Sequence, residues 1–447
     1  MSQQGLKKEI GFLAALTTVI GTVIGAGVFF KPTAVYGVTG TASLGLLAWL
    51  VGGVLTICAG LTAAELSAAI PETGGMMAYL KRTYGNLTAF LLGWAQTIIY
   101  FPANIAALAI IFGTQTVSLF GLNANEHRMM IVGIAILTAT FITLMNFLGA
   151  KAAGGIQTVF TICKLLPLAL ITIFGLLHEG DVTFQLFPIE AGPDKSFISA
   201  LGSGLLATMF AYDGWIHVGN VAGEMKNPKR DLPKAIILGL SIVMIVYLLI
   251  NVAFLLVMSA AALAGTDTPA SDVATILFGK MGGKLVSIGI LISVFGTING
   301  YTMTGMRIPY AMALEDKLPF SKWFATLSDK TRIPYNSGIF ILLVAIIMMV
   351  LGGFNTLTDM LVFVIWIFYT MTFLAVIILR KKEPDLVRPY KVPLYPVIPI
   401  IAIIGGLFIV INTLFTQTFL ALCGIGLTVL GLPIYMRKNG LKKLKNS

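Results

Sequence analysis

Two short apolar segments of this 447-residue chain contain residues that favour a break in a helix. The first, residues 18–32, has three glycines: Gly21, Gly25 and Gly27. The second, residues 202–217, has Asp213 and Gly214 near its end. Because glycine permits non-helical backbone, we expect both segments to open at these positions. An opened helix exposes amide N–H groups that hold a carboxylate and carbonyls that accept from an ammonium, so the pair could bind a zwitterion.

Both segments also have plainer interpretations. Gly21 and Gly25 have the spacing with which small residues let membrane helices pack closely, although Gly27 does not fit that spacing. Asp213 could cap the helix half that follows a break. An ionisable residue inside an apolar span is energetically costly and indicates function by default, and either interpretation of Asp213 requires a broken helix.

Lys164 is a third candidate, because it lies in an apolar stretch, residues 161–167, away from the ends of its predicted helix. A lysine in that position does not easily reach water and needs a structural or functional partner. A buried lysine can also release its proton, so a role in proton coupling stays open.

Composition indicates that membrane helices position these residues. Hydrophobic residues make up 57 % of the chain and charged residues 11 %, whereas soluble domains are about 25 % charged. Apolar runs such as residues 236–258 do not alternate with polar residues as barrel strands do. The sequence therefore predicts an all-α membrane protein. The net charge of +11 does not indicate nucleic-acid binding, because the basic residues occupy the gaps between apolar runs.

The apolar runs predict twelve transmembrane helices, most of them about 20 residues or longer. They cover residues about 10–36, 41–70, 84–119, 129–148, 153–178, 196–222, 234–258, 282–316, 336–353, 356–380, 395–415 and 418–436. The first run is longer than the apolar part of a cleaved signal peptide, so we interpret it as a membrane helix.

Basic residues are distributed unequally between the two sets of connections. If the N-terminus is cytoplasmic, 23 Lys and Arg lie on the cytoplasmic side, and Lys164 and Arg307 lie within spans. The outer side has five: Lys31, Arg128, Lys195, Lys280 and Lys284. This bias predicts that both termini, including the basic tail at residues 437–447, are cytoplasmic.

The two predicted breaks fall in the opening helices of two five-helix blocks, residues about 10–178 and 196–380. This spacing indicates an inverted repeat with a site at the bilayer midplane. Two appended helices, residues about 395–436, complete a single transmembrane domain that covers residues 1–436. The blocks share no clear residue identity, so the predicted repeat depends on spacing alone.

Four segments resemble signatures of the amino acid–polyamine–organocation superfamily. They are IGTVIGAGVF at residues 20–29, AELSAAIPETGG at 64–75, FAYDGW at 210–215 and GEMKNP at 223–228. The resemblance covers nearly the whole chain and is closest to the L-amino acid transporter branch. Within that branch, the chain resembles bacterial serine/threonine and alanine/serine/cysteine exchangers. The resemblance implies a twelve-helix inverted-repeat fold that works by alternating access.

The resemblance also implies roles for individual residues. The substrate carboxylate would bind the amides of Ala26 and Gly27, with Gly25 allowing the turn. Phe210 would form a gate over the substrate on the extracellular side. The ammonium would meet the main-chain carbonyls of four residues: Val23, Phe210, Ala211 and Asp213.

Sodium-independent members of this family carry a lysine at the position of Lys164, where sodium-coupled relatives bind an ion. Its ammonium would bridge the unwound first helix and the eighth span. Eukaryotic members of the branch bond a partner glycoprotein through a cysteine in the loop after the third span. The corresponding loop here, residues 121–128, has no cysteine, which argues against a disulfide-linked heavy subunit.

Other polar residues stay open between function and packing. Tyr100, Asn104 and Trp366 could line the pocket for the substrate side chain, although aromatic residues in membrane helices more often pack or lie at the interface. Arg307 and Glu65 could take part in cytoplasmic gating, with loop charges such as Glu224, or could form local pairs near the inner interface.

No metal site or cofactor is expected, because no cysteine–histidine or acidic cluster has the spacing of metal ligands. The three cysteines, Cys58, Cys163 and Cys423, lie in apolar runs and are interpreted as small buried residues without a disulfide.

These observations predict a sodium-independent exchanger of small neutral L-amino acids, of the serine, alanine, threonine and cysteine class, in the cell membrane. A proton-coupled amino acid symporter is the alternative. A channel is less favoured, because paired broken helices are typical of transporters. An enzyme is not expected, because the sequence offers neither a nucleophile–base pair nor a metal site.

Overall fold

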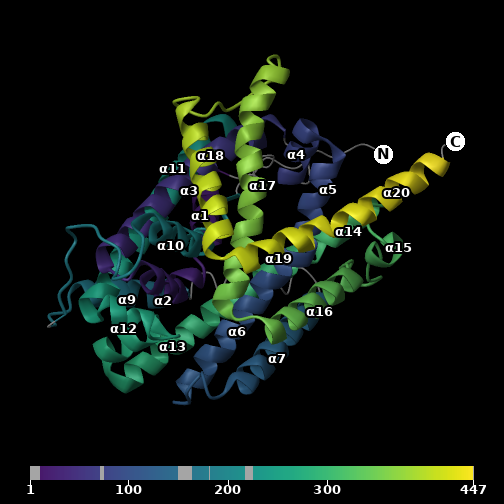
Figure 1. The fold of residues 1–447 in the computed structure, drawn as a ribbon. Coiled ribbons are helices and arrows are strands. Elements are labelled where there is room, and N and C mark those ends of the chain that lie inside the picture. The colour runs from purple at the N-terminus through teal and green to yellow at the C-terminus, as the bar shows by residue number, and fades with distance from the viewer. Residues whose placement is uncertain (1–10, 71–74, 149–163, 181, 217–224, 446–447) are drawn as a thin grey trace.

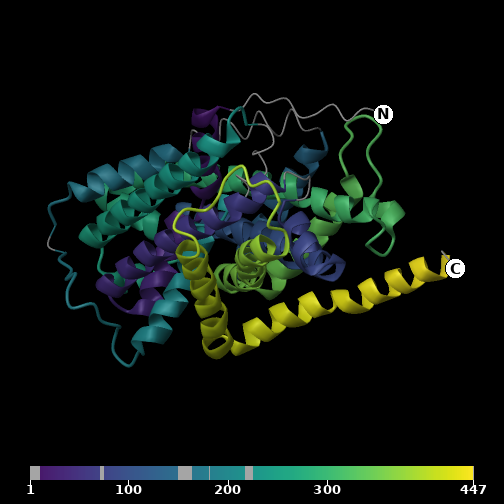
Figure 2. The ribbon, with the colours of Figure 1, turned by 90° about the horizontal axis from the view of Figure 1, so that it is seen from above.

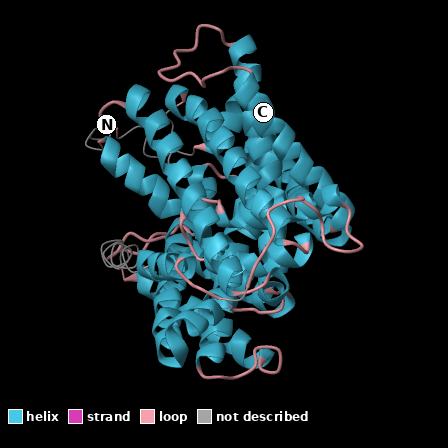
Figure 3. Ribbon diagram, turned by 90° about the vertical axis from the view of Figure 1, so that its left-hand side faces the viewer, coloured by secondary structure: helices cyan, strands magenta, loops and turns pink. Residues whose placement is uncertain are grey.

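A computed structural model describes residues 11–70, 75–148, 164–180, 182–216 and 225–445 (Figure 1). Every regular element in these ranges is a helix, and Figure 3 shows helices joined by loops. The all-α prediction is therefore confirmed for the described residues.

The first span is interrupted where its glycines predict. Helix α1 (Phe12–Val23) ends because Ile24 adopts an extended backbone, with ψ of 104°. Helix α2 (Gly27–Thr39) then continues at an angle of 48° to α1. The three residues between the two helices leave polar main-chain groups without helical partners, as at any helix end.

The sixth span ends its first half at the predicted position. Helix α10 (Phe197–Ala211) is followed by a turn, in which Gly214 has a φ of +104°. A side chain rarely adopts that backbone conformation, so glycine is required there. The second half of this predicted span lies mostly outside the described residues.

The remaining long spans agree with the predicted runs to within a few residues in most cases. They are α3 (Ala42–Ala69), α5 (Asn86–Ala95) continuing through the π-helical η1 (Gln96–Tyr100) into α6 (Phe101–Leu119), α7 (Arg128–Phe147), α11 (Pro228–Val257), α16 (Tyr335–Leu351), α17 (Phe354–Lys382) and α18 (Val397–Thr416). Helix α9 (Leu165–Leu176) represents the fifth predicted run and begins directly after residues 149–163, which are not described.

Two spans differ from the prediction. The eighth begins as α13 (Pro269–Gly305), thirteen residues before the predicted start at 282, and continues as α14 (Arg307–Leu314). Pro269 suits the first turn of a helix, and Gly279, with φ of +70°, bends α13. The last predicted run divides into α19 (Thr418–Val429) and α20 (Gly431–Lys445), and Figure 2 shows α20 extending beyond the other helices.

Eight helices of the described residues are long and apolar enough to cross a membrane, and the bent α1–α2 pair makes a ninth candidate. Three shorter apolar helices, α9, α10 and α16, lie at other predicted spans. The count of twelve stays a prediction. Three short helices were not predicted: α4 (Met76–Tyr84), α12 (Ala260–Ala264) and α15 (Ser321–Phe324).

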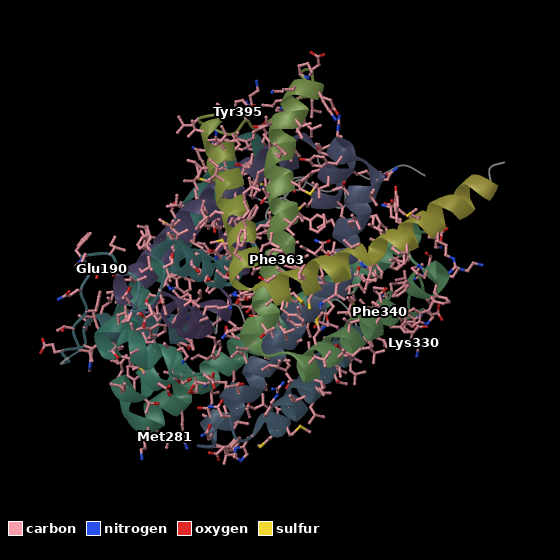
Figure 4. All side chains as sticks on the ribbon, in the orientation of Figure 1. Glu190, Met281, Lys330, Phe340, Phe363 and Tyr395 are labelled. Atoms are coloured by element: carbon pink, nitrogen blue, oxygen red, sulfur yellow. The ribbon has the colours of Figure 1, made fainter. Side chains whose placement is uncertain are left out.

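The two interrupted spans are in contact, because α2 packs against α10. Helix α11 packs against α1 and α3, and α17 packs against α6, α10 and α18. Figure 4 shows Tyr395 at the end of the molecule where α17 terminates and Met281 at the opposite end. We call these the Tyr395 end and the Met281 end.

Candidate functional site

The helix ends at the two interruptions meet at very short range. An added Cβ atom on Gly27 would lie 2.7 Å from the Cα atom of Ala211. An added Cβ atom on Gly214 would lie 2.6 Å from the carbonyl oxygen of Thr22. Glycine is thus required at both places by the approach of the other chain segment. Gly25 is different, since its nearest neighbours would lie 3.8 Å from a Cβ atom.

Tyr247 of α11 joins the carbonyls that end both helices. Its hydroxyl lies 3.0 Å from the carbonyl oxygen of Val23 and 3.0 Å from that of Ala211. The hydroxyl has one proton and can donate to only one carbonyl at a time. The other carbonyl can then accept a hydrogen bond from a ligand. The sequence analysis missed Tyr247, although a tyrosine in the middle of an apolar run needs a hydrogen-bond partner.

Asp213 lies beside the second interruption and is 6 % exposed. Tyr100 donates a hydrogen bond to one of its carboxylate oxygens, and Tyr369 donates to the other at 3.0 Å. The carboxylate makes no hydrogen bond to a backbone N–H of the described residues that follow it. The helix half that it could cap lies mostly outside the described residues, so capping stays a prediction. The sequence analysis considered Asp213 as a helix cap or as a main-chain carbonyl that accepts from the ammonium, and it missed Tyr369, which is 156 positions away.

Lys164 precedes α9, and its ammonium donates to the carbonyl oxygen of Gly21 at 2.5 Å. The structure therefore brings this lysine to the interrupted first span. Among the described residues, the Lys164 ammonium makes no hydrogen bond to the eighth span, so the second contact of the expected bridge is not observed there.

A layer of aromatic rings and one ion pair lies toward the Met281 end. The rings of Phe210 and Phe354 meet edge to face with centroids 5.6 Å apart. The fully buried Lys31 ammonium lies 5.6 Å and 5.3 Å from these two ring centroids. It donates to Thr358 at 2.7 Å and to Asp359 at 3.0 Å. We call Phe210, Phe354, Lys31 and Asp359 the aromatic layer.

Lys31 was counted above only as an outer-side charge. Its burial with Asp359 makes it a charged pair within two apolar spans, and such pairs are typical of functional positions. The sequence shows a charged residue in each of the two spans separately. The pairing itself joins residues 328 positions apart and could not be deduced from local sequence.

The predicted side-chain pocket residues lie next to the tyrosines that hold Asp213. Asn104 is fully buried and donates to the carbonyl oxygen of Tyr100, while its own amide oxygen has no partner among the described residues. Trp366 packs edge to face against Tyr369, with centroids 5.8 Å apart. Asn104 thus offers a free acceptor, whereas Trp366 mainly contributes packing.

Glu65 and Arg307, the two candidates for cytoplasmic gating or local pairing, have different surroundings. Glu65 is 1 % exposed and accepts from Arg380 at 2.5 Å and from the backbone N–H of Val392 at 2.7 Å. Arg307 instead donates to the carbonyl of Met303 in its own helical segment. The end of α3 lies near the basic end of α17, which explains the choice of partner. Glu224 lies outside the described residues.

The cysteines and acidic residues form no metal site within the described ranges, which contain no group of three or more possible ligands. Cys58 is buried and Cys423 is half-buried, both as free thiols, and Cys163 is not among the described residues.

The chain is similar in sequence to known proteins. The model of the amino acid permease family matches residues 10–430. The serine/threonine exchanger SteT of Bacillus subtilis is 44 % identical over 446 residues, which are 99 % of each chain. The human large neutral amino acids transporter small subunit 2 is 32 % identical over 96 % of this chain and 80 % of its own. The mouse b(0,+)-type amino acid transporter 1 is 30 % identical over 92 % and 84 %.

Proposed function

Because this chain belongs to the amino acid permease family, we propose that it exchanges small neutral L-amino acids across the membrane without sodium. It is a multi-pass membrane transporter and not an enzyme. The single observation that carries the substrate class is the contact between two interrupted helices at Gly27 and Ala211. Their open ends offer main-chain donors and acceptors to the two charged groups that all amino acids share.

The substrate carboxylate binds at the start of α2. No side chain caps this helix, so the amides near Ala26 and Gly27 have no capping partner. The helix dipole adds positive potential at the same place. Gly25 has room around its Cα atom and allows the carboxylate to approach.

The substrate ammonium binds at the carbonyl ends of α1 and α10. Val23 and Ala211 share the single Tyr247 proton, so one of these carbonyls is always free to accept. The neighbouring carbonyls of Phe210 and Asp213 complete the predicted set. The Asp213 carboxylate is bonded to two neutral hydroxyls, and it supplies negative charge that favours a cationic group nearby.

Selection of the side chain takes place between Tyr100, Asn104 and Trp366. The unpaired amide oxygen of Asn104 can accept from a substrate hydroxyl, which favours serine and threonine. Phe210 closes the site toward the Met281 end as part of the aromatic layer. Alternating access requires this layer to open while the Tyr395 end is closed.

Lys164 replaces a coupling cation. Its ammonium lies on the Gly21 carbonyl, so a positive charge is already present at the interrupted first span. A second candidate function, proton-coupled symport, follows from the same residue, since its ammonium has no carboxylate partner among its described contacts.

We further propose that the Tyr395 end faces the cytoplasm together with both termini. The basic residues of α17, α4 and the segment after α17 gather there, as in Arg82 and Arg380. Residues 1–436 then form one transport domain, with repeats at about 10–178 and 196–380. No disulfide-linked heavy subunit is expected, because the loop between α6 and α7 contains no cysteine.

Uptake into proteoliposomes tests the proposal. Purified protein is reconstituted with internal serine, and entry of labelled serine, alanine or threonine is measured. Uptake should accelerate when internal substrate is present and should be equal in sodium and choline buffers. A requirement for sodium, or accumulation driven by a proton gradient without internal substrate, would overturn the exchange mechanism. Arginine and glutamate should compete poorly.

A further inference from the structure

A cavity lies beside the aromatic layer, and Phe354 of that layer lines it. It has a volume of about 440 Å³, and it is lined by residues of α2, α6, α7, α17 and the connection before α13. Its charged and polar side chains include Thr33, Thr114, Asn125, Arg128, Asp267 and Asn355. The volume falls within the range of small-molecule sites, about 300–1,000 Å³.

We propose that this cavity is a separate, outer binding site for a zwitterionic amino acid, occupied before the substrate passes the aromatic layer. The inference rests on the proposed transport function for the direction of passage. Its chemical basis is independent of that function, because it depends only on the residues that line the cavity. We call this cavity the outer site.

The outer site has one charge of each sign. Arg128 can bind a carboxylate through two parallel N–H groups, and Asp267 can accept from an ammonium. Neither residue has an ion-pair partner within the described part of the chain. Lys31 and Asp359, by contrast, neutralise each other inside the neighbouring layer. The available charges therefore match a ligand that has both signs and no net charge.

The remaining lining favours a small substrate. Thr33, Thr114 and Asn355 add neutral polar groups, and Ile110 and Ile131 add apolar surface. Arg128 and Asp267 are the charged side chains among the described residues that line the cavity, so a charged substrate side chain finds no further partner among them. Arg128 and Asp267 are themselves exposed, so the preference for neutral amino acids rests on the lack of a third charged partner and not on burial.

The aromatic layer lies between the outer site and the end of α10. Phe354 lines the cavity and also packs against Phe210, whose main chain lies at the end of α10. Phe30 lines the cavity as well and lies next to Phe354, with centroids 6.3 Å apart. When the aromatic layer opens, a ligand in the outer site is already adjacent to the main-chain site. Occupancy there should lower the KM for entry from this face only.

Exchange measured separately from each face tests the outer site. Arg128→Gln and Asp267→Asn are reconstituted in vesicles in which one orientation is silenced by an impermeant reagent. The KM for serine entering from the Met281 end should rise about tenfold, the effect of losing one charged hydrogen bond. The KM from the Tyr395 end and the maximum rate should not change. Lys280→Gln and Glu126→Gln are matched controls, because neither residue lines the cavity.

A general disturbance of the fold would change KM from both faces, and that result would overturn the proposal. An unchanged KM at the Met281 end would also overturn it. Equilibrium dialysis of labelled serine with purified protein gives a second measurement that requires no transport. Two sites per chain are expected in the wild type and one in Arg128→Gln. If the wild type exchanges no serine, the transport proposal fails, while the number of bound serine molecules still decides the outer site.

Discussion

Gly27, which begins α2, and Ala211, which ends α10, are packed so closely that no side chain fits between them. The two helices belong to segments 184 positions apart in the chain, and each is interrupted beside this contact. The contact fixes the distance between the amides at the start of α2 and the carbonyls at the end of α10. These are the groups to which we assign the substrate carboxylate and ammonium.

Replacing Gly27 by Val should abolish substrate binding. The new Cβ atom would lie 2.7 Å from the Cα atom of Ala211, so the two helices must separate. Overpacking of this kind costs about 1–3 kcal/mol, and we expect serine affinity to fall by more than about tenfold. Gly37→Ala, in the same helix as Gly27, is the control. An added Cβ atom on Gly37 would lie 3.9 Å from its nearest neighbour, so this substitution causes no overpacking. Wild-type affinity in Gly27→Val would remove the carboxylate assignment.

Replacing Lys31 by Met should destabilise the protein more than replacing both Lys31 and Asp359 by apolar residues. The single change leaves a carboxylate without its cation, at a cost of about 3–5 kcal/mol for a buried pair. Asp359 is 14 % exposed, so the lower part of that range is expected. Thermal melting of the single variants and of Lys31→Met/Asp359→Leu measures the coupling. If the stability changes of the two single variants add up to that of the double variant, the two side chains do not stabilise the fold as a pair.

Replacing Lys164 by Ala should reduce the maximum exchange rate more than it reduces stability. The ammonium bonds a main-chain carbonyl of the interrupted first span, so its loss acts directly on a segment that contributes to the proposed substrate site. Exchange rate and melting temperature are measured on the same preparation. A normal exchange rate would refute the coupling role, and a variant that loses rate only in proportion to folded protein would support packing alone.

The ion pair between Arg82 and Glu383 at the Tyr395 end should make the free energy of unfolding depend weakly on pH in the acid range. The hydrogen bond from Arg82 lowers the pKa of the Glu383 carboxyl below its usual value. The pair therefore stabilises the folded state above the normal carboxyl pKa, and this contribution is lost as pH falls through the lowered value. Both side chains are about one-third exposed, so solvent screening limits the effect to about 0.2–1 kcal/mol. Arg82→Gln should remove this component from melting curves recorded between about pH 3 and 6, and an unchanged acid slope would exclude it.

The sequence was sufficient to predict the interrupted helices, because glycines at positions 25, 27 and 214 and an aspartate at 213 are strong local signals. It was insufficient for the side chains that hold the interruptions in place. Tyr247 and Tyr369 lie in apolar runs where they resemble packing residues. Their importance depends on which helices become neighbours, and a single sequence does not determine that pairing.

The boundaries of the spans were likewise predictable in some places and not in others. Apolar runs located α3 and α17 to within a few residues, because the need to cover about 30 Å of hydrocarbon sets their length. The start of α13 was missed, since its first turns include Asp272 and polar neighbours that do not continue an apolar run. Hydropathy therefore located the apolar part of that helix and missed its more polar first turns.

The single proton of Tyr247 has a mechanical consequence. The proton can pass between the carbonyls that end α1 and α10, so one side chain of α11 is shared by both helix ends. An alternating-access motion that keeps both contacts would move α1, α10 and α11 together. The spacing between the two helix ends would then be the same whichever side of the membrane the site faces.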